Sequence, residues 1–98
     1  MNRIEIYTSR YCPYCIAAKK LLLQRGMRFT EIDVSSDSMG RANMETRAKG
    51  RMTVPQIFIG SIHVGGYDDL RQLEQTGRLD DLLAGEGVPA SAQQEPRA

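Results

Sequence analysis

The sequence has 98 residues, of which 41% are hydrophobic and 26% are charged, a balance typical of one small soluble domain. Its 13 basic and 12 acidic side chains leave a net charge of +1, which gives no reason to expect nucleic acid or an anionic membrane surface as a partner. It contains no run of about 18 apolar residues and no basic-then-apolar signal sequence at the N-terminus. We therefore expect a cytoplasmic monomer with no nucleic-acid and no membrane partner.

The first predicted elements flank the only two cysteines, Cys12 and Cys15. Apolar and polar residues alternate over residues 3–8, which predicts a strand, and residues 13–25 have the spacing of an amphipathic helix that Gly26 ends. The cysteines therefore lie at a strand-to-helix turn. Two cysteines separated by two residues can close a disulfide there with little backbone movement, and the positive end of the helix dipole favours the reactive thiolate form.

The two sulfurs are not expected to be equivalent. Pro13 suits the first position of a helix, which leaves Cys12 at or just before the N-cap, exposed and close to free backbone N–H groups. Cys15 begins the apolar row of the helix, which continues with Ala18, Leu21 and Leu22, so its side chain should point inward. We therefore assign Cys12 as the attacking nucleophile and Cys15 as the resolving thiol.

Three other interpretations of the cysteine pair carry less weight. A disulfide that closes so short a loop restricts the unfolded chain very little, which disfavours a structural bond. A structural zinc site needs four ligands, whereas the sequence adds a single histidine, His63, to its two cysteines. Two inert, buried cysteines are the third alternative, because free cysteine is often buried. We expect a redox pair and no metal.

The middle of the chain predicts three further strands and one helix. Residues 28–34 are rich in β-branched side chains and predict a strand, which a strand–helix–strand crossover places parallel to the first strand. Residues 35–38 offer N-caps for a weaker helix that runs to Lys49 and is ended by Gly50. Residues 56–59 and 62–64 predict two antiparallel strands, because the Gly-Ser pair between them is typical of a type II′ turn.

The end of the chain divides into a helical part and a tail. A helix is predicted over about residues 67–76, followed by a short helix rich in leucine. Residues 85–98 are mostly small or polar, with Val88 as the only large aliphatic side chain, which predicts a disordered tail. The expected organisation is one α/β domain over residues 1–84 and a disordered tail over residues 85–98.

The order β-α-β-α-β-β-α plus a short C-terminal helix, with the dithiol at the first strand-to-helix turn, resembles the thioredoxin fold, a four-stranded mixed sheet with flanking helices. Three segments resemble the glutaredoxin family in order and spacing, and in particular the dithiol class of bacterial glutaredoxin 3. They are Cys12-Pro13-Tyr14-Cys15, Thr53-Val54-Pro55-Gln56 with Ile57-Phe58-Ile59 after it, and Gly65-Gly66-Tyr67-Asp68-Asp69. The resemblance covers residues 3–84.

The resemblance implies a binding site for glutathione as a co-substrate. In the family the proline of the second segment, here Pro55, is cis and packs beside the active-site disulfide. The residue before it, here Val54, pairs antiparallel with the cysteinyl unit of glutathione. Thr53 belongs to the same site, and Tyr14 would form one wall of it.

The third segment is expected to bind the other end of glutathione. By resemblance, Gly66, Tyr67 and Asp68 form the site for the γ-glutamyl carboxylate, and bare backbone at a helix N-terminus suits an anion. Asp68 or Asp69 would be the partner of the γ-glutamyl ammonium. An ordinary turn followed by two acidic residues that complement the helix dipole is the alternative interpretation.

The sequence departs from the family at the cation for the glycyl carboxylate of glutathione. Dithiol glutaredoxins often carry a lysine a few residues before the first cysteine, at a position that falls close to Ser9 here. Arg10 is the nearest cation and Arg51 is the second candidate. The sequence does not decide which of the two arginines binds the glycyl carboxylate.

By resemblance, the chain is a glutathione-dependent thiol–disulfide oxidoreductase that acts through the Cys12/Cys15 pair. Its expected partners are glutathione, glutathionylated proteins and protein disulfides. One alternative is a carrier of a [2Fe–2S] cluster held by two chains and two glutathiones, which Pro13 and Cys15 disfavour. Another is a redoxin reduced by thioredoxin reductase, which the segments 53–55 and 68–69 disfavour because they suit glutathione.

Overall fold

The computed structural model describes residues 2–84, so the predicted tail over residues 85–98 lies outside the described residues. The elements in chain order are β1 (Ile4–Thr8), α1 (Pro13–Gln24), β2 (Thr30–Asp33), α2 (Ser38–Arg47), β3 (Gln56–Ile59), β4 (Ile62–Gly65), α3 (Tyr67–Gln75) and α4 (Leu79–Leu83). The predicted order of strands and helices is confirmed, and the fold is the thioredoxin fold. Among residues 2–84, none of the helices is long and apolar enough to cross a membrane.

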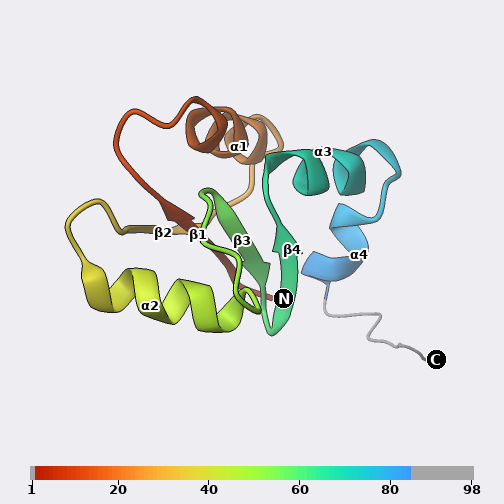
Figure 1. Cartoon of the computed structure of the whole chain (residues 1–98). Helices are drawn as coiled ribbons and strands as arrows, with labels where there is room; N and C mark the ends of the chain where they lie inside the picture. Colours follow the sequence, from red (N-terminus) through yellow and green to blue (C-terminus); the bar gives the residue numbers. More distant parts are fainter. Residues whose placement is uncertain (1, 85–98) are drawn as a thin grey trace.

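The four strands form one mixed sheet in the order β2-β1-β3-β4. Strands β1 and β2 are parallel, as the crossover predicts, whereas β3 is antiparallel to both β1 and β4. Gly60, between β3 and β4, has a φ of +60°, the value that a type II′ turn requires at its first central position. Helices α1 and α3 cover one face of the sheet and α2 covers the other (Figure 1).

Each face of the sheet has its own apolar core, because successive side chains of a strand point to opposite faces. Ile6 and Ile57 of the two central strands pack with Leu22 of α1 on one face. Tyr7 packs with Met44 of α2 on the other face. All five side chains are buried. The two cores fix the direction of β1, whose carboxyl end leads directly into the cysteine turn.

Two predicted elements differ by more than one residue at an end from the observed ones. The second strand covers Thr30–Asp33 and not residues 28–34, because β2 is an edge strand whose pairing with β1 begins at Thr30 and ends at Asp33. Helix α2 begins after Asp37, whose carboxylate accepts a hydrogen bond from the N–H of Gly40 at 2.9 Å. That cap lies within the predicted N-cap segment. The helix ends at Arg47, two residues before the predicted end at Lys49, because Lys49 has a φ of +57° and cannot continue it.

Candidate active site

Cys12 is the N-cap residue of α1, and Pro13 occupies the first position of the helix, as predicted. The backbone of Cys12 is extended, with φ −103° and ψ 105°. Its Sγ accepts a hydrogen bond from the N–H of Cys15 at 3.2 Å. The sulfur thus takes the place that a serine or aspartate oxygen has in most N-caps, and a negatively charged sulfur accepts such a bond more strongly than a neutral one.

Cys15 is buried, as its place in the apolar row predicts, with 1% of its surface exposed, whereas Cys12 is half-buried. Burial, followed by the neighbouring Cys12 sulfur, raises the pKa of the Cys15 thiol from 9.0 to about 12. The backbone N–H of Ser9 and the charge of Lys19 act in the opposite direction. The structure therefore separates an accessible sulfur at the helix end from a buried one that is protonated at neutral pH.

The segment before β3 lies against Cys12. The Sγ of Cys12 is 3.7 Å from the carbonyl oxygen of Val54, and the Val54–Pro55 peptide bond is cis, as the resemblance implies. Within residues 2–84, no backbone hydrogen bond engages the N–H of Val54. The N–H of Val54 is therefore available to pair with an extended peptide beside the Cys12 sulfur.

A groove of about 310 Å³ lies beside Cys12, and this volume is within the range of about 300–1,000 Å³ that is common for small-molecule sites. Nine of the ten residues assigned to glutathione from the sequence line it: Tyr14, Arg51, Thr53, Val54, Pro55, Gly66, Tyr67, Asp68 and Asp69. They come from α1, from the loop before β3 and from the start of α3. A larger hollow of about 760 Å³ lies against Ile4 at the opposite end of β1, away from both cysteines.

The start of α3 forms one end of the groove. Oδ2 of Asp69 accepts a hydrogen bond from the N–H of Gly66 at 2.9 Å and lies 3.7 Å from Nη1 of Arg51. Helix geometry leaves the N–H groups of Tyr67 and Asp68 without an acceptor inside the helix, so they are available to an anion. Asp69 is thus engaged within the protein, whereas the carboxylate of Asp68 is exposed at the groove.

Two aromatic rings form the wall between α1 and α3. The ring centroids of Tyr14 and Tyr67 are 6.3 Å apart, with an angle of 34° between the ring planes. Tyr14 lines the groove and is largely exposed, so its ring is accessible from solvent.

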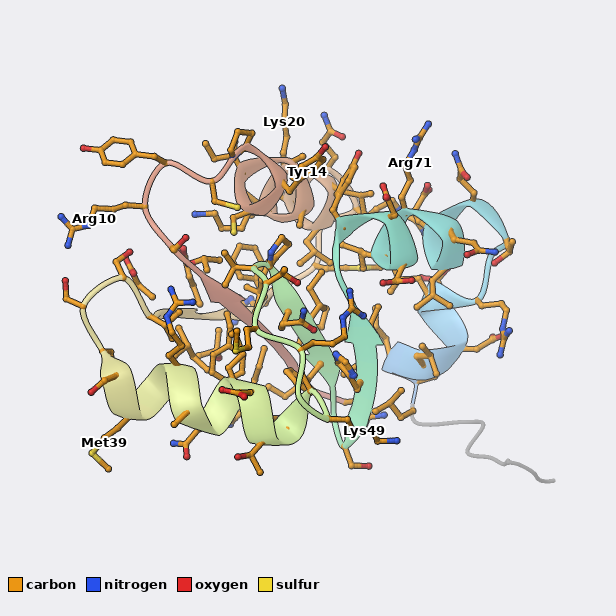
Figure 2. All side chains as sticks on the ribbon, in the orientation of Figure 1. Arg10, Tyr14, Lys20, Met39, Lys49 and Arg71 are labelled. Carbon is orange, nitrogen blue, oxygen red and sulfur yellow. The ribbon has the colours of Figure 1, made fainter. Side chains whose placement is uncertain are left out.

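Arg10 is the predicted residue that the structure does not bring to the groove. Its guanidinium donates a hydrogen bond to Oγ of Ser36 at 3.1 Å, and its backbone N–H donates to Oγ of Ser35 at 2.7 Å. Figure 2 shows the Arg10 side chain extending from the cysteine loop, away from Tyr14. Of the two candidate cations, only Arg51 lines the groove.

The structure also joins three residues that the spacing in the sequence did not connect. Lys19 of α1 and Thr8 of β1 both donate hydrogen bonds to Oε2 of Glu31 in β2, at 2.9 Å and 2.7 Å. These two hydrogen bonds, that of Lys19 first, hold the pKa of Glu31 below its ordinary value. The three residues meet only because β1 pairs with β2 and α1 packs over them.

Comparison with known proteins decides the family. The family model for glutaredoxin matches residues 4–64. The chain belongs to the glutaredoxin family. It is 50% identical over 84 residues to a glutaredoxin of Pseudomonas aeruginosa, an alignment that covers 86% of this chain and 99% of that protein. It is 48% identical over 83 residues to glutaredoxin 3 of Escherichia coli, covering 85% of this chain and 99% of that protein.

Solved structures of glutaredoxins agree with this one in fold. The solution structure of glutaredoxin from Brucella melitensis superposes with a TM-score of 0.74 at 55% identity, covering 85% of this chain and 89% of that one. The crystal structure of a buckwheat glutaredoxin–glutathione complex superposes with a TM-score of 0.75 at 34% identity, covering 86% and 78% of the two chains. The predicted resemblance is confirmed, and this glutaredoxin is a glutathione-dependent thiol–disulfide oxidoreductase.

Proposed function

We propose that this glutaredoxin acts as a cytoplasmic monomer that reduces glutathionylated proteins and protein disulfides, with Cys12 as the nucleophile and Cys15 as the resolving thiol. The observation that carries the proposal is the position of Cys12 beside a groove lined by nine residues of the expected glutathione site. The accessible sulfur contacts Val54, which lines this groove, and the buried sulfur lies one helical turn further along α1.

The groove fits glutathione in one direction. The cysteinyl unit pairs with the backbone of Val54, which places its sulfur against Sγ of Cys12. The γ-glutamyl carboxylate accepts hydrogen bonds from the N–H groups of Tyr67 and Asp68 at the positive end of α3. The carboxylate of Asp68 binds the γ-glutamyl ammonium, because Asp69 is already engaged by Gly66.

Two further side chains complete the proposed site. Arg51 supplies the cation of the groove for a carboxylate of glutathione, since Arg10 is bound to Ser36 on the far side of the cysteine loop. An arginine suits this role because its planar guanidinium can donate two parallel hydrogen bonds to a carboxylate. The exposed ring of Tyr14 packs against the peptide.

Removal of glutathione from a protein needs only Cys12. Its thiolate attacks the glutathione sulfur, a bond forms between Cys12 and glutathione, and the protein sulfur leaves as a thiolate that takes up a proton. A second glutathione thiolate then attacks the sulfur of the bound glutathione. This step releases glutathione disulfide and restores the Cys12 thiolate.

Reduction of a protein disulfide needs both cysteines. Cys12 attacks one sulfur of the substrate and forms a mixed disulfide, while the other substrate sulfur leaves. Cys15 then attacks Sγ of Cys12, which forms the Cys12–Cys15 disulfide and releases the second substrate thiol. Two glutathione molecules afterwards reduce this disulfide and leave as glutathione disulfide.

Two serine variants test the assignment. Cys12→Ser should lose all activity, whereas Cys15→Ser should keep removal of glutathione from a glutathionylated peptide and lose reduction of a protein disulfide. Glutathione and glutathione reductase are the only electron source in one assay, and thioredoxin reductase replaces them in a parallel assay. Equal activity of the two variants on the peptide would overturn the roles, and turnover only with thioredoxin reductase would overturn the glutathione site.

A second measurement tests the proposals that the protein is a monomer and carries no metal. The protein purified without air and in the presence of glutathione should be colourless and should elute as a monomer from a sizing column. A brown protein that elutes as a dimer would instead support carriage of a [2Fe–2S] cluster through Cys12 of two chains.

A further inference from the structure

We propose that Lys19 is a positioning residue that stabilises the Cys15 thiolate in the resolving step, and that it thereby promotes reduction of protein disulfides and not removal of glutathione. The inference rests on the proposed function, because Cys15 takes part only in the route that uses both cysteines. It concerns a residue outside the glutathione groove.

In the resolving step a buried cysteine must become charged, whereas the accessible Cys12 meets no such obstacle. Only the thiolate form of a cysteine attacks a disulfide, and Cys15 is 1% exposed. Burial opposes a charge there and is the largest cause of its raised pKa. Resolution at neutral pH therefore needs groups near Cys15 that favour the charged sulfur.

Lys19 is placed for this task by the helix and by an anchor on β2. It follows Cys15 by four residues on α1, so the two side chains lie on the same face of the helix, one turn apart. Its Nζ is held 2.9 Å from Oε2 of Glu31, and its side chain is only 29% exposed. Thr8, which is buried, donates to the same carboxylate and holds it in place.

The surroundings of Cys15 contain few other charges. The charged and titratable groups around Cys15 and Lys19 come from three segments. They are Cys12 at the start of α1, Arg10 of the preceding loop, and Glu31 and Asp33 of β2. Cys12 raises the pKa of Cys15 and Lys19 lowers it.

The chemistry of the first step changes this balance. When Cys12 enters a mixed disulfide its sulfur carries no charge, so the repulsion between Cys12 and a Cys15 thiolate disappears. The Ser9 N–H and the Lys19 charge then remain as the contacts that favour the thiolate. Burial still opposes the charge, but the Cys15 thiolate forms more readily once Cys12 is bound to a substrate, and the Lys19 charge then favours it without opposition from Cys12.

The resolving step needs no reactant other than the two cysteines, the bound substrate and solvent protons. Cys15 loses its proton to solvent, and its thiolate attacks Sγ of Cys12. A sulfur–sulfur bond forms between the two cysteines as the bond between Cys12 and the substrate sulfur breaks. The substrate sulfur is reduced and leaves as a thiolate, which takes up a proton from solvent, and the Cys15 sulfur is oxidised.

The test follows the two sulfurs separately in the full chain. Reduced protein is mixed with dithiobis(nitrobenzoate), an aromatic disulfide whose released half, the nitrothiobenzoate anion, is coloured. Attack by Cys12 releases one nitrothiobenzoate anion, and attack by Cys15 on the resulting mixed disulfide releases a second. The two phases of absorbance change are recorded against pH for wild type, Lys19→Met, Lys19→Arg and Lys20→Met. Lys20 is the matched control, because it is an exposed lysine on the same helix, one residue further along.

We expect Lys19→Met to slow the second phase roughly tenfold at neutral pH and to move its pH midpoint upward by about one unit, as for loss of a nearby opposite charge. The first phase should change less than about twofold. Lys19→Arg should restore the second phase, and Lys20→Met should alter neither. Equal second-phase rates in the two methionine variants, or equal slowing of both phases in Lys19→Met, would overturn the proposal.

The outcome is independent of the proposed glutathione site. The aromatic disulfide contains no glutathione, so a chain that failed to turn over with glutathione could still show the effect of Lys19. Conversely, normal removal of glutathione from a peptide together with an unchanged second phase in Lys19→Met would leave the proposed function standing and would refute only the role of Lys19.

Discussion

The sulfur of Cys12 lies 3.7 Å from the carbonyl oxygen of Val54, although 42 positions separate the two residues in the sequence. Cys12 follows β1 and Val54 precedes β3, and these strands are neighbours that pair antiparallel, with Tyr7 opposite Gln56. The end of β1 and the start of β3 therefore lie side by side. Strand pairing holds the reactive sulfur next to the backbone that we expect a substrate peptide to use.

Alkylation should distinguish the two cysteines. Iodoacetamide at neutral pH should modify Cys12 and leave Cys15 unmodified, because burial keeps the pKa of Cys15 at about 12 and hides its sulfur. Fragmentation of the peptide that contains both residues locates the modification by mass spectrometry. Protein unfolded in urea is the control, and both cysteines should react there. Equal labelling of both cysteines in the folded protein would contradict the assignment.

Replacement of Arg51 should weaken glutathione binding. Arg51→Met should raise KM for a glutathionylated peptide roughly tenfold, since a hydrogen bond to a charged group contributes about 1.5 kcal/mol. Arg10→Met is the matched control and should stay within about twofold of wild type, because Arg10 is bound to Ser36 and does not line the groove. Steady-state kinetics with glutathione reductase measures both. A larger effect from Arg10 would reverse the assignment.

The two neighbouring glycines before α3 should respond differently to alanine. Gly65 has a φ of +116°, and a Cβ there would collide with the carboxylate of Asp69. Gly66 has a φ of −94°, and the nearest atom to a Cβ there, the carbonyl oxygen of Pro55, is 3.7 Å away.

Gly65→Ala should therefore lower the free energy of unfolding by about 1–3 kcal/mol and weaken glutathione binding, because it disturbs the start of α3. Gly66→Ala should cost less than about 1 kcal/mol. Urea unfolding measures the difference. Equal stability of the two variants would show that the start of α3 tolerates a side chain at both positions.

His63 should make the fold sensitive to mild acid. Its ring stacks on Phe58 with centroids 4.8 Å apart, and its Nε2 lies 2.7 Å from Oε1 of Gln56. Burial, followed by the charges of Arg51 and Lys49, lowers the pKa of His63 below its ordinary value of 6.5. The unfolded chain therefore binds a proton at a higher pH than the folded one, so this stability is complete above pH 6.5 and is lost as the pH falls through the lower folded pKa.

His63→Gln should abolish the loss of stability that begins below pH 6.5, which thermal unfolding at a series of pH values would detect. The lowered pKa of Glu31 gives a second loss that begins only below pH 4.5, and the variant should keep it. If His63→Gln lost stability between pH 6.5 and pH 4.5 as steeply as wild type, the role of His63 would be contradicted.

Local sequence determined the cysteine turn. Pro13 at the first helical position, the apolar row that begins at Cys15, and Gly26 after the helix act over three or four residues, and the structure has all three features as predicted. The Gly60-Ser61 turn is local in the same sense. Interactions within one or two turns depend on backbone geometry and side-chain type, both of which can be taken from the chain directly.

Other predictions rested on the family resemblance and not on local physics. Spacing along the chain does not place Val54 beside Cys12, and the groove becomes visible only when three distant segments are brought together. The resemblance supplied these residues in advance, with Arg10 as the exception.

The tertiary structure alone placed Arg51, and not Arg10, at the groove, and it alone joined Lys19 to Glu31 and Thr8. These contacts depend on strand order and register, which follow from burial of both faces of the whole sheet. Arg10 is closer to Cys12 in sequence, yet the chain carries it toward the loop after β2, while the pairing of β1 with β3 brings the segment before β3 to the sulfur. Proximity along the chain could not predict this, because the sheet sets distances between segments.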